Sequence, residues 1–600
     1  MALGSLLPDL NLRPLVESLA EHAVTKPDAK AFTFVDYSSD RDGAKHTLTW
    51  GEVWRRSQAT AAALRQIAEP GDRAALLLPQ SLEYLISMCG AFASQIIAVP
   101  LFSPDLPGNA DRLIRAYSDA EPAVIVTLSS ALPYVEKFLD EHEVPRPRGI
   151  VLADEIDPAL GEGWELPELS PDDLAYLQYT SGSTSSPAGV EITHGGFAAN
   201  ARQLWRSWDP PEIETCEAVT WLPLFHDMGL ITALALPLVN GNHVILADPM
   251  SFLMRPIRWM RLLSECPNVY TAGPNFAYDY VAGQANDKSL AGLDLSGVNV
   301  CLNGAEPIRP STLKAFNDAF APAGLRPGVL RPAYGLAEAT VFVSGSFVTN
   351  PDPTVPARLL GVDREALTQG RIVPFEGSEE DAEGDRVQYL VSCGAPQGQY
   401  VALVDPETGR EQPDGTVGEI WVHGPNVGRG YWGNCERSAE TFNAVIQDAQ
   451  GIPAGGWMRT GDFGAVHDGE LYVTGRIKDL IIVDGRNHYP QDIEVTAEEA
   501  SPAIRPDYVA AFSIPGEETE RLVVVAERNR RVPIAKLDLA EVERAVRTRV
   551  NQVHEMHIHE FVLIEPGSLS RTSSGKVARA ATRTRYLEGG LVRTTDRLAR

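Results

Sequence analysis

The chain has 600 residues, of which 44% are apolar and 8% aromatic, as is typical of a globular protein with a sizeable core. Its 80 acidic side chains outnumber 52 basic ones, which gives a formal net charge of −28. This acidic excess argues against nucleic acid as the main partner and against a basic surface for membrane binding. The six cysteines stand far apart without any C-x-x-C pair, so the sequence predicts neither a disulfide framework nor a zinc site.

The sequence indicates no targeting or membrane-spanning segment. The N-terminus has no basic region before an apolar block, so no signal peptide is expected. The longest apolar run, near Gly229–Val239, is too short to span a bilayer. We therefore expect a cytoplasmic protein that is not an integral membrane protein.

Residues 1–170 alternate predicted strands with predicted helices. In chain order these are a helix within Leu48–Ile67, a strand at Ala74–Leu78, a helix at Ser81–Ala93 and strands at Ile96–Leu101, Pro122–Thr127 and Gly149–Leu152. This alternation favours a parallel sheet with helical crossovers. The fold class predicted from the sequence is therefore α/β.

A polar loop follows the alternating run Leu174–Tyr179, which predicts a strand. Within it, hydroxyl side chains surround a glycine, in the order Thr180, Ser181, Gly182, Ser183 and Thr184. Such a loop can turn its backbone N–H groups and hydroxyls toward a phosphate chain. It is not a Walker loop, because no Lys-Ser/Thr follows the closing Gly189. Considered alone, it can also be read as a polar turn between two strands, since such turns are common.

Further motifs follow this loop along the chain. In order they are the aromatic-His segment Val219–Gly229, Asn303–Pro307 after a predicted strand at Val298–Leu302, Tyr334–Glu338 (Y-G-L-A-E), Arg459–Asp462 (R-T-G-D), Gly475–Asp479 (G-R-I-K-D) and Leu569–Lys576. Together with the loop, they resemble the motifs of the adenylate-forming superfamily: acyl-CoA synthetases, luciferases and peptide-synthetase adenylation domains. The resemblance extends from about Leu48 to Arg579.

The resemblance implies an ATP site, in which the hydroxyl loop binds phosphates. Gly304 and Ala305 would lie against the adenine, where a glycine permits close backbone approach. Tyr334, followed by Gly335, would stack on the adenine, because an aromatic ring offers a flat face to a base. Asp462 would accept hydrogen bonds from both ribose hydroxyls, although an ordinary turn aspartate is the alternative.

The remaining motif residues are implied to serve the chemistry around the nucleotide. Glu338 and Thr184 would bind Mg²⁺, a hard cation that prefers oxygen ligands; a helix N-terminal acid is the alternative for Glu338. Arg476 would approach the nucleotide. Lys576 would enter the site and neutralise charge on the α-phosphate, unless it is only an exposed loop lysine.

His226 carries two open interpretations. In the family this motif borders the carboxylate pocket, so His226 would position the substrate carboxylate or shape the mouth of a tunnel. The alternative is a packing histidine without a chemical role.

The resemblance also implies two domains. Residues 1–476 would form a large adenylating domain of mixed sheets with crossover helices. Residues 477–600 would form a small, mobile α+β domain that carries Lys576 and rotates between two half-reactions. Lys478 occupies the position of the family's hinge.

One segment distinguishes this chain from ordinary acyl-CoA synthetases. Ser344–Leu390 is long and rich in proline and acids, and an insertion here, within residues 345–390, resembles the fatty acyl-AMP ligase branch. A disordered acidic loop is the alternative. The phosphate loop also carries Ala188 where the family often has lysine, a departure shared by many members of this branch.

The function implied is ATP-dependent activation of a fatty acid to an acyl adenylate with release of pyrophosphate. The acyl group would then pass to the phosphopantetheine thiol of an acyl carrier protein of a polyketide or lipid synthase. The alternatives are a fatty acyl-CoA ligase, an aryl or amino-acid adenylating enzyme, and a nucleotide-binding scaffold without turnover. Basic side chains outnumber acidic ones in the sequence after Lys576. They could bind an acidic carrier protein, or they could simply form a solvated helix face.

Overall fold

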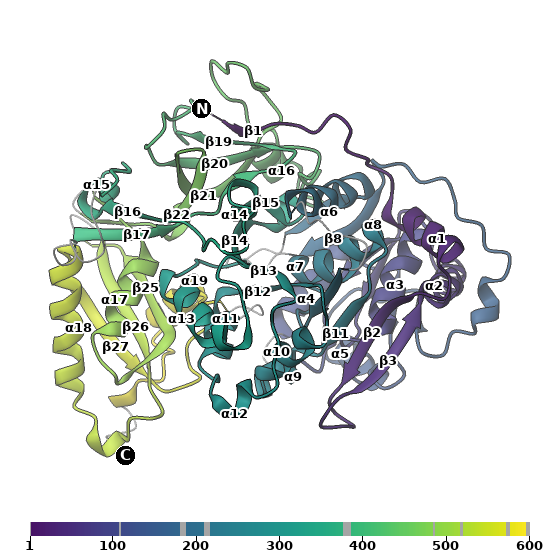
Figure 1. Cartoon of the computed structure of the whole chain (residues 1–600), viewed down its shortest axis with the longest axis horizontal. Coiled ribbons are helices and arrows are strands. Elements are labelled where there is room, and N and C mark those ends of the chain that lie inside the picture. The colour runs from purple at the N-terminus through teal and green to yellow at the C-terminus, as the bar shows by residue number, and fades with distance from the viewer. Residues whose placement is uncertain are drawn as a thin grey trace.

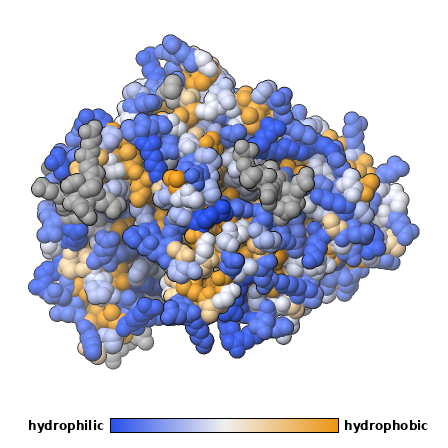
Figure 2. Space-filling model, in the orientation of Figure 1, coloured by the Kyte–Doolittle hydropathy of each residue, from blue (hydrophilic) through white to orange (hydrophobic). Residues whose placement is uncertain are grey.

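The computed structural model describes residues 2–106, 110–179, 188–208, 216–375, 386–483, 486–516, 520–571 and 576–595 (Figure 1). Within these ranges, every helix is too short or too polar to cross a bilayer. Hydrophilic residues cover much of the face shown in Figure 2, in keeping with the many charged side chains.

The N-terminal third contains a six-stranded sheet. Its strand order is β7 (Gly149–Leu152), β6 (Val124–Thr127), β4 (Arg73–Leu76), β5 (Ile97–Pro100), β8 (Leu174–Tyr179) and β9 (Gly189–Thr193). All pairings are parallel except the one between β8 and β9. The helices of this region are α2 (Trp50–Arg65), α3 (Leu82–Ala93), α4 (Ala110–Ala120) and α5 (Leu132–Glu141). The predicted α/β alternation is therefore confirmed, with element ends shifted by a few residues.

A nine-stranded sheet forms the centre of the molecule. Its order is β18 (Ala395–Pro396), β15 (Phe342–Gly345), β14 (Leu330–Gly335), β13 (Val298–Gly304), β12 (Val269–Pro274), β10 (Glu217–Thr220), β11 (Val244–Ala247), β2 (Lys30–Asp36) and β3 (Ala44–Thr49). The strands from β14 to β2 are parallel, and the outer pairs are antiparallel. The carboxyl ends of β12, β13 and β14 therefore meet at one edge, where ligands of open α/β sheets usually bind.

Helices connect and flank this central sheet. They are α1 (Leu15–Thr25), α6 (His194–Trp208), α7 (Asp227–Leu230), α8 (Leu236–Asn240), α9 (Pro249–Met254), α10 (Ile257–Ser264), α11 (Asn275–Ala282), α12 (Asp287–Leu290), α13 (Pro310–Phe320) and α14 (Ser346–Thr349). Between α7 and α8, Ile231–Ala235 is π-helical and wholly buried. The apolar run near Gly229–Val239 thus lies in a largely buried helical segment.

A third, antiparallel sheet contains strands from both ends of the large region. Its order is β1 (Leu3–Gly4), β19 (Tyr400–Val404), β20 (Gly418–His423), β21 (Met458–His467) and β22 (Glu470–Arg476), and α16 (Cys435–Phe442) lies beside β21. The last two strands pair so that Asp462 stands opposite Arg476. Two separate motifs of the sequence are therefore brought together by strand register.

The segment predicted as an insertion is partly regular. β16 (Leu359–Asp363) and β17 (Val387–Val391) pair in antiparallel fashion, and α15 (Arg364–Thr368) follows β16 directly. The acidic residues 376–385 lie outside the described part of the chain.

The C-terminal residues build a smaller unit. It contains the pair β23 (Ile481–Val483) and β24 (Arg486–His488), and a sheet ordered β25 (Ile504–Ile514), β26 (Arg521–Arg528) and β27 (Ile558–Ile564), with α17 (Pro490–Glu499), α18 (Leu539–His554) and α19 (Arg579–Leu587). Its two apolar clusters consist only of residues from Ile481 onward. Figure 1 shows this unit, in yellow-green, at the left, beside α11 and α13 of the larger unit.

Candidate active site

A cavity of about 1090 Å³ lies between the large unit and the small one. Its walls include the carboxyl ends of β13 and β14, the ends of β21 and β22, helix α17 and the segment that carries Lys576. The predicted residues Gly304, Ala305, Tyr334 and Gly335 line it at the sheet edge. Parallel strand ends and inter-domain clefts are both common places for small-molecule sites.

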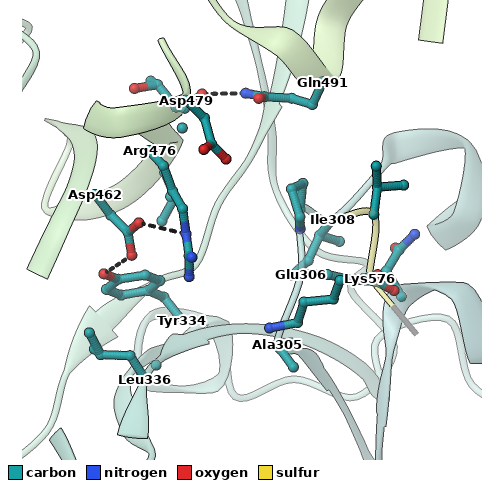
Figure 3. Close-up of a pocket in the computed structure, with 18 of the residues that line it drawn as sticks. Ala305, Glu306, Ile308, Tyr334, Leu336, Asp462, Arg476, Asp479, Gln491 and Lys576 are labelled. Atoms are coloured by element: carbon teal, nitrogen blue, oxygen red, sulfur yellow. Dashed lines mark hydrogen bonds and ion pairs between the residues drawn. The ribbon is translucent and has the colours of Figure 1, made fainter. Parts of the chain in front are cut away.

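Asp462 is the centre of a hydrogen-bonded cluster on one wall. Its Oδ2 accepts a hydrogen bond from the Tyr334 hydroxyl at 2.7 Å, and its Oδ1 lies 3.3 Å from Nε of Arg476 (Figure 3). The Asp462 carboxylate raises the pKa of Arg476, which therefore stays charged. Burial and the same carboxylate raise the pKa of Tyr334, which stays a hydrogen-bond donor. The cluster thus presents a ring, a fixed carboxylate and a cation to the cavity.

The turn after β14 places Glu338 in the same cavity. One of its oxygens, Oε1, accepts a hydrogen bond from the hydroxyl of Tyr431 at 2.9 Å. The turn is tightly specified, because a Cβ at Gly335 would lie 1.8 Å from the carbonyl oxygen of Val341. Thr340 adopts a positive φ of 67°, a strained value for a β-branched residue, and its hydroxyl donates to the Asn426 carbonyl at 2.7 Å. Glu338 is therefore held by a rigid turn.

The turn after β13 contributes a second carboxylate. Ala305 has a φ of +68°, unusual for a residue with a side chain, and the next residue is Glu306. The Oε1 atom of Glu306 accepts a hydrogen bond from the backbone N–H of Phe276 at 2.5 Å. Burial raises the pKa of Glu306 against the lowering effects of that hydrogen bond and of Lys576. Glu306 was not among the predicted site residues, although it stands inside a recognised motif.

Lys576 enters the cavity from the small unit. Figure 3 shows its side chain extending into the space opposite Asp462 and Tyr334. Burial lowers the pKa of Lys576, and the nearby Arg476 cation lowers it further; the carboxylates of Asp227, Glu306 and Asp462 oppose this. Charged groups from four separate segments therefore act on this ammonium group.

His226 lies at the cavity wall as the residue that precedes α7. Its Nδ1 atom is 2.6 Å from Oδ1 of Asp227. Burial opposes ionisation of Asp227, but His226 and Lys576 together hold the pKa of this carboxyl below its usual value. Arg112 also lines the cavity, and burial lowers its pKa to about 10. Neither Asp227 nor Arg112 was predicted, although Asp227 is adjacent to His226 in the sequence.

The cavity also has an apolar part. Residues of this kind in its lining include Leu204, Phe225, Met228, Leu302, Val341 and Phe342. An apolar wall beside a charged cluster suits a substrate with a hydrocarbon chain and a polar head.

The predicted phosphate-loop residues Thr180, Ser181, Gly182, Ser183 and Thr184 lie outside the described residues. The strand before them ends at Tyr179, which lines the cavity and donates a hydrogen bond to Asp119 at 2.7 Å. Every other predicted site residue borders this cavity.

Comparison with known proteins connects this fold and site to a family. The family model for AMP-binding enzyme matches residues 19–432, and the model for Disco-interacting protein 2-like, AMP domain, matches residues 478–595. The long-chain-fatty-acid–AMP ligase FadD32 of Mycolicibacterium smegmatis is 40% identical over 96% of this chain and 95% of its own. A Mycobacterium tuberculosis protein that carries the name of a fatty-acid–CoA ligase, fadD25, is 39% identical over 94% and 95%.

Solved structures give the same result. The fatty acyl-adenylate ligase from L. pneumophila, solved in complex with acyl adenylate and pyrophosphate, is 32% identical and covers 98% of both chains, with a TM-score of 0.72. The chain belongs to the AMP-binding enzyme family and, within it, to the fatty acid–AMP ligases. This confirms the resemblance, the fold class and the enzymatic function implied by the motifs. ATP use is supported with it, whereas Mg²⁺ remains a prediction.

Proposed function

We propose that the cavity joins a fatty acid to AMP and that the acyl group then passes to the phosphopantetheine thiol of an acyl carrier protein. In the first step, a carboxylate oxygen of the fatty acid attacks the α-phosphorus of ATP, and the bond to the β-phosphate breaks to release pyrophosphate. In the second step, the thiol sulfur attacks the acyl carbonyl, AMP leaves and the thiol proton passes to solvent. The observation that carries the proposal is the convergence of Lys576 with Asp462, Arg476 and Glu306 in one cavity.

The Asp462 cluster is proposed as the nucleoside site. A carboxylate already fixed by Tyr334 and Arg476 can accept hydrogen bonds from ribose hydroxyls without reorganising. The Tyr334 ring, whose hydroxyl is occupied by Asp462, offers its face to the adenine beside Gly304 and Ala305.

Lys576 is proposed as the group that stabilises charge on the α-phosphate. An ammonium group in a partly buried site acts more strongly on a developing phosphoryl charge than it would in water. Thr180, Ser181, Gly182, Ser183 and Thr184 are proposed to hold the β- and γ-phosphates. His226, paired with Asp227, is proposed to orient the fatty carboxylate.

Glu338 fits the metal that this chemistry needs. One carboxylate oxygen is held in place by the Tyr431 hydroxyl, and carboxylate oxygens are the hard ligands that Mg²⁺ prefers. Glu338 would hold Mg²⁺ together with Thr184, and the ion would neutralise phosphate charge when bound.

Replacing Tyr431 with phenylalanine tests the Glu338 assignment. Loss of one hydrogen bond to a charged group costs roughly 1.5 kcal/mol, so the half-saturating Mg²⁺ concentration should rise about tenfold. Mn²⁺ affinity, measured by electron paramagnetic resonance with a non-hydrolysable ATP analogue, should fall by the same factor. Tyr134→Phe, at an exposed tyrosine, is the control; unchanged metal affinity in Tyr431→Phe would remove Glu338 as the ligand.

The proposed acceptor is a carrier protein rather than CoA. The insertion contacts the small unit, because Nε2 of Gln388 on β17 donates to Oδ2 of Asp492 on α17 at 2.7 Å. A contact of this kind favours the orientation that the structure has over a rotated one, and we propose that this restraint hinders thioester formation with CoA. A fatty acyl-CoA ligase remains the alternative function, because the relative fadD25 carries the name of a fatty-acid–CoA ligase.

A product assay tests the function and its acceptor together. The enzyme is incubated with Mg-ATP and radiolabelled dodecanoate alone, with CoA, and with a holo acyl carrier protein. We expect an acyl adenylate that persists with CoA and is consumed by the carrier protein. Rapid formation of acyl-CoA would instead establish the acyl-CoA ligase, and absence of any adenylate would point to a different acid.

A further inference from the structure

An ion-pair network joins the two units at the edge of the active site. Arg309, the residue before α13 in the large unit, places Nη1 3.0 Å from Oε2 of Glu498 and 2.8 Å from Oδ1 of Asp507. Glu498 lies on α17 and Asp507 on β25, so both carboxylates belong to the small unit. One guanidinium therefore bridges the boundary between the parts that move in the proposed reaction.

The network is organised on both sides of this boundary. The backbone N–H of Asp507 donates to Oε1 of Glu498 at 2.9 Å, which ties the two acids to each other. On the other side, the backbone N–H of Arg309 donates to Oδ1 of Asn275 at 3.3 Å. Asn275 in turn donates to the hydroxyl of Thr312 at 3.0 Å. The geometry of the ion pairs is thus fixed by each unit separately.

These ion pairs are largely shielded from water. The side chains of Arg309 and Glu498 are 27% and 8% exposed. Burial opposes the charge on Arg309, but the two carboxylates outweigh it and hold the pKa of the guanidinium above its usual value. Removing one partner from such a group leaves an uncompensated charge, which strongly disfavours the arrangement.

The network adjoins Lys576 without touching the proposed nucleotide cluster. Arg309, Glu498, Asp507 and Lys576 all line the same cavity. Arg309 stands three residues after Glu306, whose carboxylate interacts electrostatically with Lys576. Asp462, Tyr334 and Arg476 make their contacts with one another on a different wall. A change at Arg309 is therefore expected to act on domain orientation and to leave the nucleoside contacts intact.

We propose that Arg309 is a positioning residue that holds the small unit in the orientation that brings Lys576 into the active site. This inference rests on the proposed function, because it assigns the orientation seen here to adenylate formation. In this orientation, Arg309 pairs with both Glu498 and Asp507 across the boundary. Loss of the network lowers the population of the adenylating orientation. The network can shift the equilibrium between orientations because its ion pairs stabilise one orientation more than the other.

The kinetic test uses Arg309→Gln with Lys314→Gln as its matched control. Lys314 lies on the same helix but is 77% exposed and pairs with Asp318 of its own helix. Adenylate formation is followed by fatty-acid-dependent exchange of pyrophosphate into ATP. Acyl transfer is followed separately, from synthetic acyl adenylate to a holo carrier protein. We expect Arg309→Gln to slow exchange about tenfold or more with transfer unchanged or faster, Arg309→Lys to restore part of the exchange rate, and Lys314→Gln to match the parent.

A second readout follows orientation directly. Of the six cysteines, all of them described, Cys435 on the large unit is exposed and the other five are buried. Dyes on Cys435 and on a cysteine introduced by Gln552→Cys on α18 report the inter-domain distance by energy transfer. Arg309→Gln should broaden or shift that distribution. An unchanged distribution, or an equal fall in exchange and transfer, overturns the proposal. If the parent shows no exchange with any fatty acid, the proposed function fails, while the energy-transfer result still decides the role of Arg309 in orientation.

Discussion

Replacing Lys576 with alanine is expected to slow acyl-adenylate formation by about two to three orders of magnitude, the usual effect of removing one group that stabilises transition-state charge. The charges of Asp227, Glu306, Asp462 and Arg476 act on this ammonium group, and all five residues line the cavity. The rate is measured as fatty-acid-dependent pyrophosphate exchange at saturating ATP. If Lys576 acts on the phosphoryl charge as proposed, the loss should appear in kcat rather than in the KM for ATP.

The second half-reaction supplies the internal control for this variant. Transfer from synthetic acyl adenylate involves no attack at phosphorus, so Lys576→Ala should retain it. Lys288→Ala, at an exposed lysine on α12, should behave as the parent in both assays. A Lys576→Ala protein with parental exchange would exclude the proposed role and favour a scaffold that binds nucleotide without turnover.

Replacing Asp462 with alanine is expected to raise the KM for ATP by about 100-fold or more. Each lost hydrogen bond to a charged group costs roughly 1.5–3 kcal/mol, and the ribose would lose two of them. The change also leaves the Tyr334 hydroxyl and the Arg476 guanidinium without the acceptor they share. Isothermal titration with a non-hydrolysable ATP analogue measures the same loss without turnover.

Asp448→Ala is the matched control for this second prediction. Asp448 is a surface acid, 77% exposed, that pairs with Arg410 away from the cavity. The ATP affinity of the Asp448→Ala variant should equal that of the parent. Thermal unfolding of Asp462→Ala separates a binding defect from a folding defect; unchanged nucleotide affinity in a folded Asp462→Ala protein would contradict the ribose assignment.

The fold class was predictable because hydrophobic periodicity reports local structure. The run Leu174–Tyr179 forms β8 with the predicted bounds, and the strand predicted at Ala74–Leu78 forms as Arg73–Leu76. The order of strands within the sheets was not predictable, since periodicity carries no information on which strands pair. Strand register, such as Asp462 opposite Arg476, appears only in the folded chain.

In the site, likewise, the motif residues were predictable and the residues that contact them were not. Lys576, Asp462 and Glu338 stood in motifs, so the resemblance identified them. Tyr431 is 93 residues from Glu338 in the chain, and Glu498 is 189 residues from Arg309. No local pattern links residues so far apart, and an ordinary tyrosine or arginine gives no signal of the contact that tertiary folding creates.

The separate apolar clusters of the C-terminal unit have a consequence for the proposed domain rotation. Among the described residues, the two apolar clusters of this unit contain only residues of the unit itself, whereas Leu480 and Tyr489 belong to the cluster of the large unit. The proposed rotation would therefore leave these two clusters covered from water, and the small unit could turn without unfolding them. The small unit would then move as a rigid body, with its own apolar clusters intact throughout the movement.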